Sequence, residues 1–356
     1  MGRFVLGVLR ALHGRTDVRL TLCCRDSIGP PPKTILEPSP SPVHAGSDAV
    51  TPPYASSASD PRRHAPAWGY LPWSRLSGEP GIDVAWFPWN RVDPRPPAWS
   101  VVTIHDTAAF DWPVRGRFAF IENHRAQQRL RTACKRATRV MTVSNFSKCC
   151  IERHLGVNDA RIDVVSEGAS LPPAMGTEHP SKPFVLFVGA QDPRKNLDGL
   201  LEAWRQLRES NASGEHELVV AGCRRNKIDG VRWLGEIDDV QLAALYQQCA
   251  LFVMPSRYEG FGLPLLEALA SGAPAAAARA ASLPEVGGDA VAWFDPENAH
   301  EMALVIAKLL ADPSQRARLS AAAIHQAALF SWERAAGEVL SSLRRAVASN
   351  PRPNSV

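Results

Sequence analysis

Short apolar runs alternate with helical patterns over most of this chain. In the first half, the apolar runs lie at 81–90, 99–106, 139–148 and 161–168, with a basic helical segment before the third. In the second half they lie at 184–190, 216–222 and 250–256, with helical patterns at 197–209 and 240–248. Apolar strands that alternate with helices indicate parallel sheets covered on both faces. The pattern therefore predicts an α/β protein with two doubly wound domains.

The first 15 residues have apolar positions at helical spacing, interleaved with Arg3, Arg10 and Arg15. This pattern predicts an amphipathic helix, because a signal peptide would need an uninterrupted apolar stretch and a small-residue cleavage site. The alternating, β-branched run at 17–24 predicts a buried strand.

Proline, serine and alanine dominate residues 25–72, a composition that cannot bury enough apolar surface to offset its ordering entropy. We expect a flexible insertion there and a linker at 170–183. The predicted organisation is an N-terminal domain at 1–173, a C-terminal domain at 174–330 and a final helix at 331–348.

A length of 356 residues also favours two domains. The chain has no apolar run of about 18 residues, so we predict no spanning helix. Its seven cysteines include no CxxC pair, which favours reduced thiols and a cytoplasmic protein, including one at the inner face of a membrane.

Positive charge is concentrated in one stretch of the N-terminal half, at Arg115, Arg117, Arg125, Arg129, Arg131, Lys135, Arg136 and Arg139. The simplest interpretation is a solvated helix face. A peripheral contact with an anionic membrane, or with a phosphate-bearing acceptor, is the functional alternative. We expect no nucleic-acid partner, because the stretch lacks interleaved aromatic residues for base stacking.

The segment 256–272 has the pattern of a strand, a tight glycine turn and a helix. Gly260 and Gly262 flank Phe261, Pro264 suits a first helical position, and Gly272 suits a C-terminal cap. Backbone amides at such a helix start form an anion site that fits a diphosphate. Glu259 and Glu267 follow the strand, and a carboxylate that accepts two hydroxyl hydrogen bonds suits a sugar diol.

This segment resembles the Glu-x7-Glu signature of glycosyltransferase family 4, the retaining group 1 nucleotide-sugar transferases of GT-B fold. The blocks at 184–204, 282–296 and 330–345 resemble the same family, as do VVTIHD and VMTVSNFSK in the first half. The resemblance implies two Rossmann-like domains that face a central cleft, with the final helix returning to the first domain. It also implies a metal-independent hexosyltransferase that retains the anomeric configuration.

The resemblance assigns donor-binding roles to residues on both sides of the glycine turn. Glu267 would hold the nucleotide ribose, and Glu259 would contact hydroxyls of the donor sugar. The backbone around Gly260, Phe261, Gly262 and Leu263 would meet the diphosphate, in line with the anion site predicted from the pattern.

Arg194 and Lys195 match a basic pair that neutralises the departing diphosphate, with Gly189 at the start of their block. They could instead be helix surface charges, although cations at a helix start oppose its dipole. His105 matches a histidine beside the donor sugar, with Asp106 supporting its loop. Alternatively, His105 is a core residue whose hydrogen bonds are all satisfied.

Several motifs are missing from the sequence: a GxGxxG after a strand, a GxxxxGK[ST] and a DxD. We therefore expect no metal and no cofactor beyond the nucleotide-diphosphate sugar, which is the donor substrate. The predicted function is transfer of a sugar, with mannose as the first guess, to a glycan or lipid-linked acceptor in cell-surface polysaccharide synthesis. The alternatives are a sugar-nucleotide epimerase or phosphorylase on the same fold, and a non-catalytic homologue that binds only nucleotide.

Members of this family open with an apolar strand and a glycine-rich turn before a helix that begins Gly-Arg-Phe or Gly-Arg-Tyr. Here Gly2, Arg3 and Phe4 already begin that helix. We therefore expect an N-terminal domain without its first strand, and a truncated or misassigned start.

Overall fold

The computed structural model describes residues 2–13, 15, 17–18, 83–92, 96, 98–114, 116, 119–172 and 182–349. Most of the strand expected at 17–24, the whole segment 25–72 and most of the linker at 170–183 lie outside the described residues. The chain forms two units, residues 1–11 with 83–356 and residues 12–82. The elements below belong to the first unit, apart from the last residue of α1.

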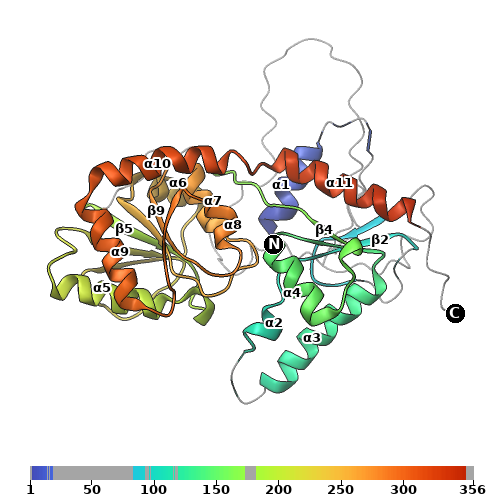
Figure 1. The fold of residues 1–356 in the computed structure, drawn as a ribbon, viewed down its shortest axis with the longest axis horizontal. Coiled ribbons are helices and arrows are strands. Elements are labelled where there is room, and N and C mark those ends of the chain that lie inside the picture. Colours follow the sequence, from blue (N-terminus) through green and yellow to red (C-terminus); the bar gives the residue numbers. More distant parts are fainter. Residues whose placement is uncertain are drawn as a thin grey trace, which may run out of the picture. The chain divides into compact units, whose positions relative to one another are not determined.

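In the part of the chain that the structure describes, the first sheet has four parallel strands in the order β1-β2-β3-β4 (Figure 1). These strands are β1 (Ala85–Phe87), β2 (Ser100–Ile104), β3 (Arg139–Thr142) and β4 (Ile162–Val164). The helices in this part of the chain are α1 (Gly2–Leu12), α2 (Ala108–Asp111), α3 (Ala119–Arg136) and α4 (Asn145–Leu155), with a 3-10 turn at Asp159–Arg161. The core beside the first sheet is formed by apolar residues of β2, β3, α3 and α4, such as Val102, Val140, Leu130 and Ile151.

The apolar run at 139–148 contains a strand and the start of a helix. Ser144 ends the extended segment, and its side chain accepts a hydrogen bond from the amide of Ser147, which caps α4. Gly156 ends α4 with a φ of 63°, in the left-handed region that favours glycine.

The second sheet has six parallel strands in the order β10-β9-β8-β5-β6-β7. These are β5 (Phe184–Val188), β6 (Glu217–Ala221), β7 (Val231–Gly235), β8 (Leu251–Met254), β9 (Ala275–Ala278) and β10 (Val291–Phe294). The strand order reverses beside β5, whose neighbours are β6 and β8. The predicted α/β class with two parallel sheets is therefore confirmed.

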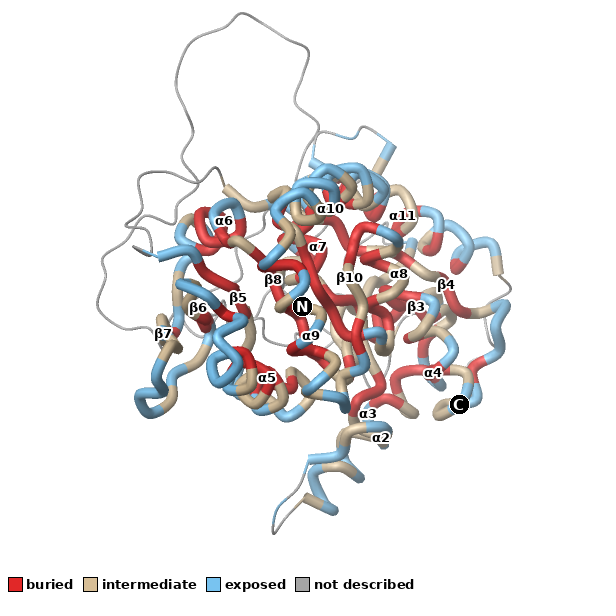
Figure 2. The backbone as a smooth tube through the Cα atoms, turned by 60° about the vertical axis from the view of Figure 1, so that its left-hand side comes forward, coloured by how far each residue is buried: buried red, intermediate tan, exposed pale blue. Residues whose placement is uncertain are grey.

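Helices cover the second sheet, whose strands are largely buried (Figure 2). A 3-10 turn, η3 (Pro193–Lys195), precedes α5 (Leu197–Glu209), and the chain continues through α6 (Asp239–Gln248), α7 (Leu263–Ala270), α8 (Leu283–Gly287), α9 (Ala299–Ala311) and α10 (Pro313–Ala327). None of the described helices is long and apolar enough to cross a bilayer.

The last helix, α11 (Trp332–Ala348), packs against β2 and β3 of the first sheet. A buried carboxylate, Asp163 in β4, connects this helix to the sheet. It accepts a hydrogen bond from Ser342 at 2.5 Å and pairs with Arg345 at 2.9 Å, while Arg139 of β3 donates two hydrogen bonds of 2.8 Å to it.

Candidate functional site

The loops that follow β5 and β8 carry most of the predicted site residues. These two strands are neighbours at the point where the strand order of the sheet reverses. Open α/β sheets bind ligands at the carboxyl ends of their strands, at such a reversal. Arg194 and Lys195 follow β5, and Glu259 and Gly260 follow β8, so the topology brings the predicted basic pair and the predicted acidic residue together.

The basic pair lies in the 3-10 turn η3, which Asp192 caps by accepting a hydrogen bond from the amide of Arg194 at 2.9 Å. The guanidinium of Arg194 donates to the same carboxylate at 2.7 Å, which lowers the pKa of Asp192 and raises that of Arg194. Lys195 Nζ donates to Glu259 Oε1 at 2.7 Å. Both cations therefore have carboxylate partners in the absence of a donor. Next to them, Gly189 continues the sheet by donating its amide hydrogen bond to the carbonyl of Ala221 at 2.9 Å.

The glycine turn is packed too closely to admit side chains. A Cβ at Gly260 would lie 2.2 Å from the carbonyl oxygen of His105, and Gly262 has a φ of 107°. Ser282 Oγ bonds to the carbonyl oxygens of Glu259 and Phe261, at 3.0 and 2.7 Å, and so fixes the turn from α8.

Helix α7 begins directly after this turn. Among the described residues, no acceptor takes a hydrogen bond from the amides of Phe261, Gly262 or Leu263. Amides at a helix start attract anions through their unpaired N–H groups and the helix dipole. The diphosphate role of these amides stays a prediction.

Glu267 lies in the middle of α7 with only 3% of its surface exposed. Tyr246 of α6 donates its hydroxyl hydrogen bond to Glu267 Oε2 at 3.3 Å. Arg3 of α1 forms an ion pair with the same carboxylate and a second ion pair with Asp239 of α6. Burial raises the pKa of Glu267, while the nearby guanidinium of Arg3 acts in the opposite direction. Glu259 and Glu267 thus have different partners, Lys195 and Arg3.

His105 is buried at the end of β2. Its Nε2 donates a hydrogen bond to the carbonyl of Pro88 at 2.9 Å, and its Nδ1 lies 3.8 Å from a carboxylate oxygen of Glu167. The ring of Phe4 meets it edge-on at 5.3 Å. The imidazole of His105 is therefore held by Pro88 and Glu167. The backbone carbonyl of His105 lies against the glycine turn. Asp106 supports this loop by accepting the amide hydrogen bond of Ala108.

The structure adds residues that sequence reasoning did not assign to the site: Arg3, Tyr246, Ser144 and Glu285. Ser144 Oγ donates to the carbonyl of Gly260 at 2.6 Å. Glu285 of α8 accepts the amide hydrogen bonds of Asn145 and Phe146, at 2.8 and 2.6 Å. Arg3 was visible only as part of the Gly-Arg-Phe start of a helix. Ser144 and Glu285 lie within blocks that resemble the family, and Tyr246 lies in a predicted helix, but only the fold brings these three residues to the site.

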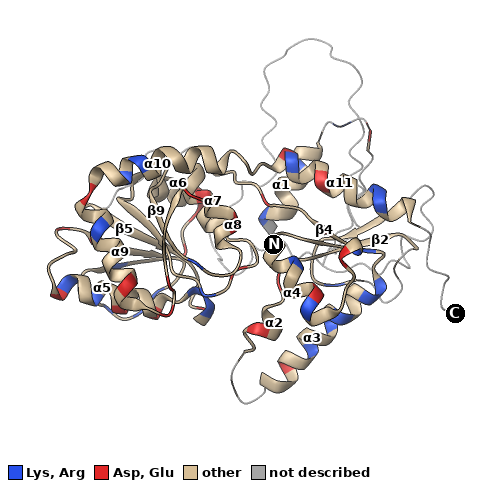
Figure 3. Ribbon diagram, in the orientation of Figure 1, with Lys and Arg blue, Asp and Glu red and all other residues tan. Residues whose placement is uncertain are grey.

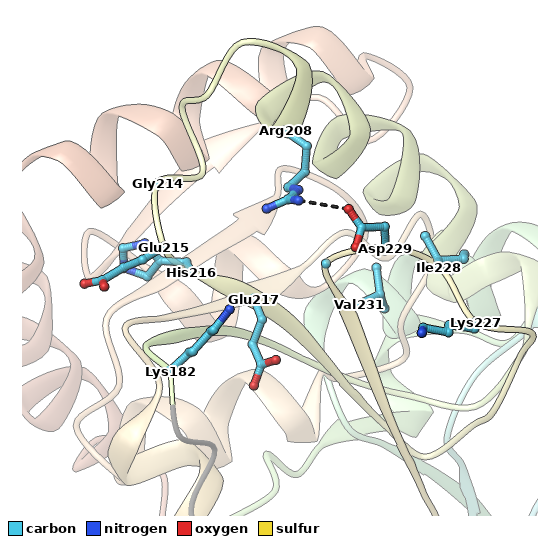
Figure 4. A pocket seen from close by; sticks show the side chains of 11 residues that line it. Lys182, Arg208, Gly214, Glu215, His216, Glu217, Lys227, Ile228, Asp229 and Val231 are labelled. Carbon is cyan, nitrogen blue, oxygen red and sulfur yellow. Dashed lines mark hydrogen bonds and ion pairs between the residues drawn. The ribbon is translucent and has the colours of Figure 1, made fainter.

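Two hollows lie beside the second sheet. One, of about 290 Å³, is lined by residues just before or at the start of β5, β6 and β7, such as Lys182, Glu217 and Val231 (Figure 4). Arg208 and Asp229 form an ion pair of 2.9 Å on its wall. Ligands of parallel sheets bind at the opposite, carboxyl ends of the strands, so this hollow is a poor candidate for the donor. The other, lined by residues that include Gln191, Arg224 and Arg225, lies beyond the carboxyl ends of β5 and β6.

Comparison with known proteins identifies two family models along the chain. Residues 1–171 match the model of Glycosyltransferase Family 4, and residues 176–326 match the model of Glycosyl transferases group 1.

Among curated proteins, the chain is similar to the O-antigen chain mannosyltransferase B of Escherichia coli, with 31% identity over 272 residues, 69% of this chain and 70% of that protein. It is 28% identical over 251 residues to an MMP α-(1→4)-mannosyltransferase of Mycolicibacterium hassiacum, covering 66% of this chain and 59% of the relative. It also matches the serotype-specific mannosyltransferase WbdA of Escherichia coli at 32% identity, but spans only 22% of that longer protein.

Among solved structures, the sucrose-phosphate synthase of Thermosynechococcus elongatus has a TM-score of 0.62 at 20% identity, covering 78% of this chain and 77% of that one. This likeness shows the fold. Together with the two family models and the relatives, it confirms the resemblance predicted from the glycine turn and its flanking blocks. The chain therefore belongs to the group 1 glycosyltransferases and has their GT-B fold.

Proposed function

We propose that this glycosyltransferase moves a hexose, with mannose as the first candidate, from a nucleoside-diphosphate donor to a glycan or lipid-linked acceptor and retains the anomeric configuration. The observation that supports this most strongly is the meeting of Arg194, Lys195 and Glu259 on the loops after β5 and β8, beside the start of α7.

The charges of these residues suit the departure of a nucleoside diphosphate. Negative charge grows on the leaving group as the glycosidic bond breaks, and fixed cations stabilise it. Arg194 and Lys195 supply that charge, and the amides at the start of α7 add hydrogen bonds to the phosphates. These groups make a divalent metal unnecessary in the proposed site. Glu267 holds the ribose, and Glu259 contacts the donor sugar.

Two observations favour mannose and polysaccharide synthesis. The relatives reported above are named mannosyltransferases, and one of them is named for O-antigen chains. GDP-mannose is therefore the donor to test first.

The test is a panel of sugar nucleotides scored by the nucleotide released, with and without EDTA. We expect GDP release from GDP-mannose, unchanged by EDTA, and transfer of the sugar to an added oligosaccharide with the α-configuration retained. Interconversion of sugar nucleotides, or a requirement for phosphate as acceptor, would instead identify an epimerase or a phosphorylase. Nucleotide binding without any release across the panel would identify a non-catalytic homologue.

We also propose a peripheral contact with an anionic membrane through helix α3, which carries much of the basic stretch (Figure 3). At 100° per residue, one exposed face of this helix combines Ile121 with four exposed cations, Arg125, Arg129, Lys135 and Arg136. At the start of the helix, Phe120 is 83% exposed. Cations next to exposed apolar side chains suit an anionic lipid surface, because both the charges and the apolar groups gain from contact. A lipid-linked acceptor would be reached from such a surface.

Co-sedimentation with vesicles tests this contact. We expect binding to phosphatidylglycerol vesicles that weakens in high salt, and little binding to phosphatidylcholine. Replacing Arg125 and Arg129 by Gln should lower binding roughly 30-fold, because each cation contributes about 1 kcal/mol. The exposed Leu304 of α9 provides a control, since Leu304→Ser should bind like the unaltered protein. Equal binding to neutral vesicles, or no loss in the Gln variant, would remove the membrane from the proposal.

A further inference from the structure

The carboxylate of Glu267 is enclosed by groups from two other helices. Arg3 reaches it from α1, and Tyr246 and Asp239 face it from α6. Arg3 is fixed in turn by its own helix, because Phe4, Val5 and Val8 are buried in the protein. The contact therefore joins the first turn of α1 to the centre of α7.

Burial favours the protonated form of a carboxyl group, and this opposes the role of Glu267 as an acceptor of hydrogen bonds from a ligand. A desolvated carboxyl group gains stability by taking up a proton, and it then offers fewer acceptor sites. Asp239 adds a negative charge that also favours the protonated form of Glu267. Arg3 is the cation that opposes both effects, and its second ion pair with Asp239 neutralises the other carboxylate.

We infer that Arg3 is a positioning residue for donor binding, whose guanidinium keeps Glu267 ionised and oriented so that its remaining acceptor sites face the ribose. An ionised carboxylate has about four acceptor sites. Arg3 and Tyr246 occupy one each in the structure, which leaves two for the two hydroxyl groups of a ribose diol. This inference rests on the proposed role of Glu267 in donor binding.

Two other roles for the ion pair of Arg3 and Glu267 predict results that differ from those of a positioning role. If Arg3 only fastened α1, its loss would lower stability without changing the pH dependence of nucleotide binding. If Arg3 blocked the ribose site, its loss would tighten binding. A positioning role requires weaker binding that becomes more sensitive to acid, and that loss must depend on Glu267.

The experiment is calorimetric binding of GDP and of UDP by the full chain between pH 5.5 and 8. The proteins are the unaltered chain, Arg3→Ala, Arg3→Lys, Glu267→Gln and the double variant Arg3→Ala with Glu267→Gln. Arg10, exposed on the same helix, provides the matched control Arg10→Ala. Melting temperatures show whether each variant folds.

With the nucleotide that the unaltered chain binds, Arg3→Ala should bind about tenfold more weakly at pH 7, because losing the cation favours the protonated carboxyl group and leaves the carboxylate without the hydrogen bond that orients it. Its affinity should fall at a higher pH than that of the unaltered chain as the solution is acidified. Arg3→Lys should recover most of the affinity. In the Glu267→Gln background, Arg3→Ala should cause no further loss.

Unchanged or tighter binding in Arg3→Ala would overturn the inference, as would an equal loss in the Glu267→Gln background. If Arg3→Ala fails to fold, the comparison of Arg3→Lys with the unaltered chain decides, because a charge-preserving variant must keep the pH profile. Failure of the proposed donor site looks different: the unaltered chain binds neither nucleotide, or Glu267→Gln binds as tightly as the unaltered chain.

Discussion

Arg194 and Lys195 are paired with carboxylates in the structure, and this pairing explains how two neighbouring cations can be held at a site that binds an anion. Asp192 and Glu259 compensate their charge and hold the side chains in place, at 2.7 Å in both pairs. The side chains are still 33% and 21% exposed, so a diphosphate can approach them.

We predict that Arg194→Ala and Lys195→Ala each lower kcat about 100-fold. Each variant loses a cation that stabilises the negative charge of the leaving group, and this charge is greatest in the transition state. The measurement is steady-state nucleotide release. Arg205→Ala is the control, since Arg205 is exposed on α5 and pairs with Glu202 and Glu209 of its own helix. Turnover at the unaltered rate in either site variant would exclude that residue from the site.

The site residues differ in how far the sequence could reveal them. Arg194, Lys195 and Glu259 stand in recognisable blocks after two strands, and adjacency of β5 and β8 brings them together. The pairing of Arg3 with Glu267 joins positions 264 residues apart and depends on how α1 packs. A linear pattern contains no information about such a contact.

At the scale of elements, periodicity predicted α5 within the same bounds, residues 197–209, that the structure shows. It did not predict β9, whose four residues are all alanine. Alanine is the best helix former, so local propensity points the wrong way there. In the sheet, β9 is fully buried between β8 and β10, where small side chains allow close packing, and tertiary context overrides propensity.

A buried carboxylate in β4, Asp163, adds polar contacts between α11 and the first sheet to their apolar packing. Burial on its own would raise the pKa of Asp163, but hydrogen bonds from Arg139 and Ser342 hold it below its ordinary value of 3.8. A carboxylate with a lowered pKa stabilises the folded state above that ordinary value, and the stabilisation is lost as the pH falls through the lower folded pKa.

Asp163→Asn should therefore destabilise the protein by roughly 3 kcal/mol at pH 7, because Arg139, whose side chain is only 12% exposed, is left without its counter-charge. Thermal or urea unfolding measures the effect. The difference from the unaltered chain should begin to shrink below about pH 3.8 and should vanish only below the lower folded pKa, where Asp163 is neutral in the folded protein as well. Asp229→Asn removes an exposed carboxylate that pairs with Arg208 and should cost little. A difference that persists unchanged in acid would show that charge is not the cause.

At the scale of the whole molecule, α4 of the first sheet contacts the loops of the second. Ser144 and Ser147 both donate hydrogen bonds to the carbonyl of Gly260, at 2.6 and 3.0 Å. Glu285 accepts the first two amides of α4, where a carboxylate also complements the helix dipole. The glycine turn that carries the proposed donor contacts is thus held by residues of both domains.

Glu285→Ala should slow turnover about tenfold, because it removes charged hydrogen bonds that hold α4 against α8, whose N-terminal Ser282 fixes the turn. Nucleotide affinity should change little, since the proposed nucleotide contacts come from α7 and η3. Kinetics and calorimetry on the same variant separate the two effects. Glu338→Ala, which removes a partner of Arg334 on α11, is the control. Normal turnover in Glu285→Ala would show that this contact has no part in the reaction.

The measurement that tests the account most directly is the nucleotide affinity of Glu267→Ala, compared with the unaltered chain by calorimetry at pH 7.5. Loss of a carboxylate that accepts ribose hydroxyl groups should weaken binding by roughly 1.5–3 kcal/mol, with the melting temperature showing an intact fold. An affinity equal to that of the unaltered chain would contradict the placement of the donor at the carboxyl ends of β5 and β8.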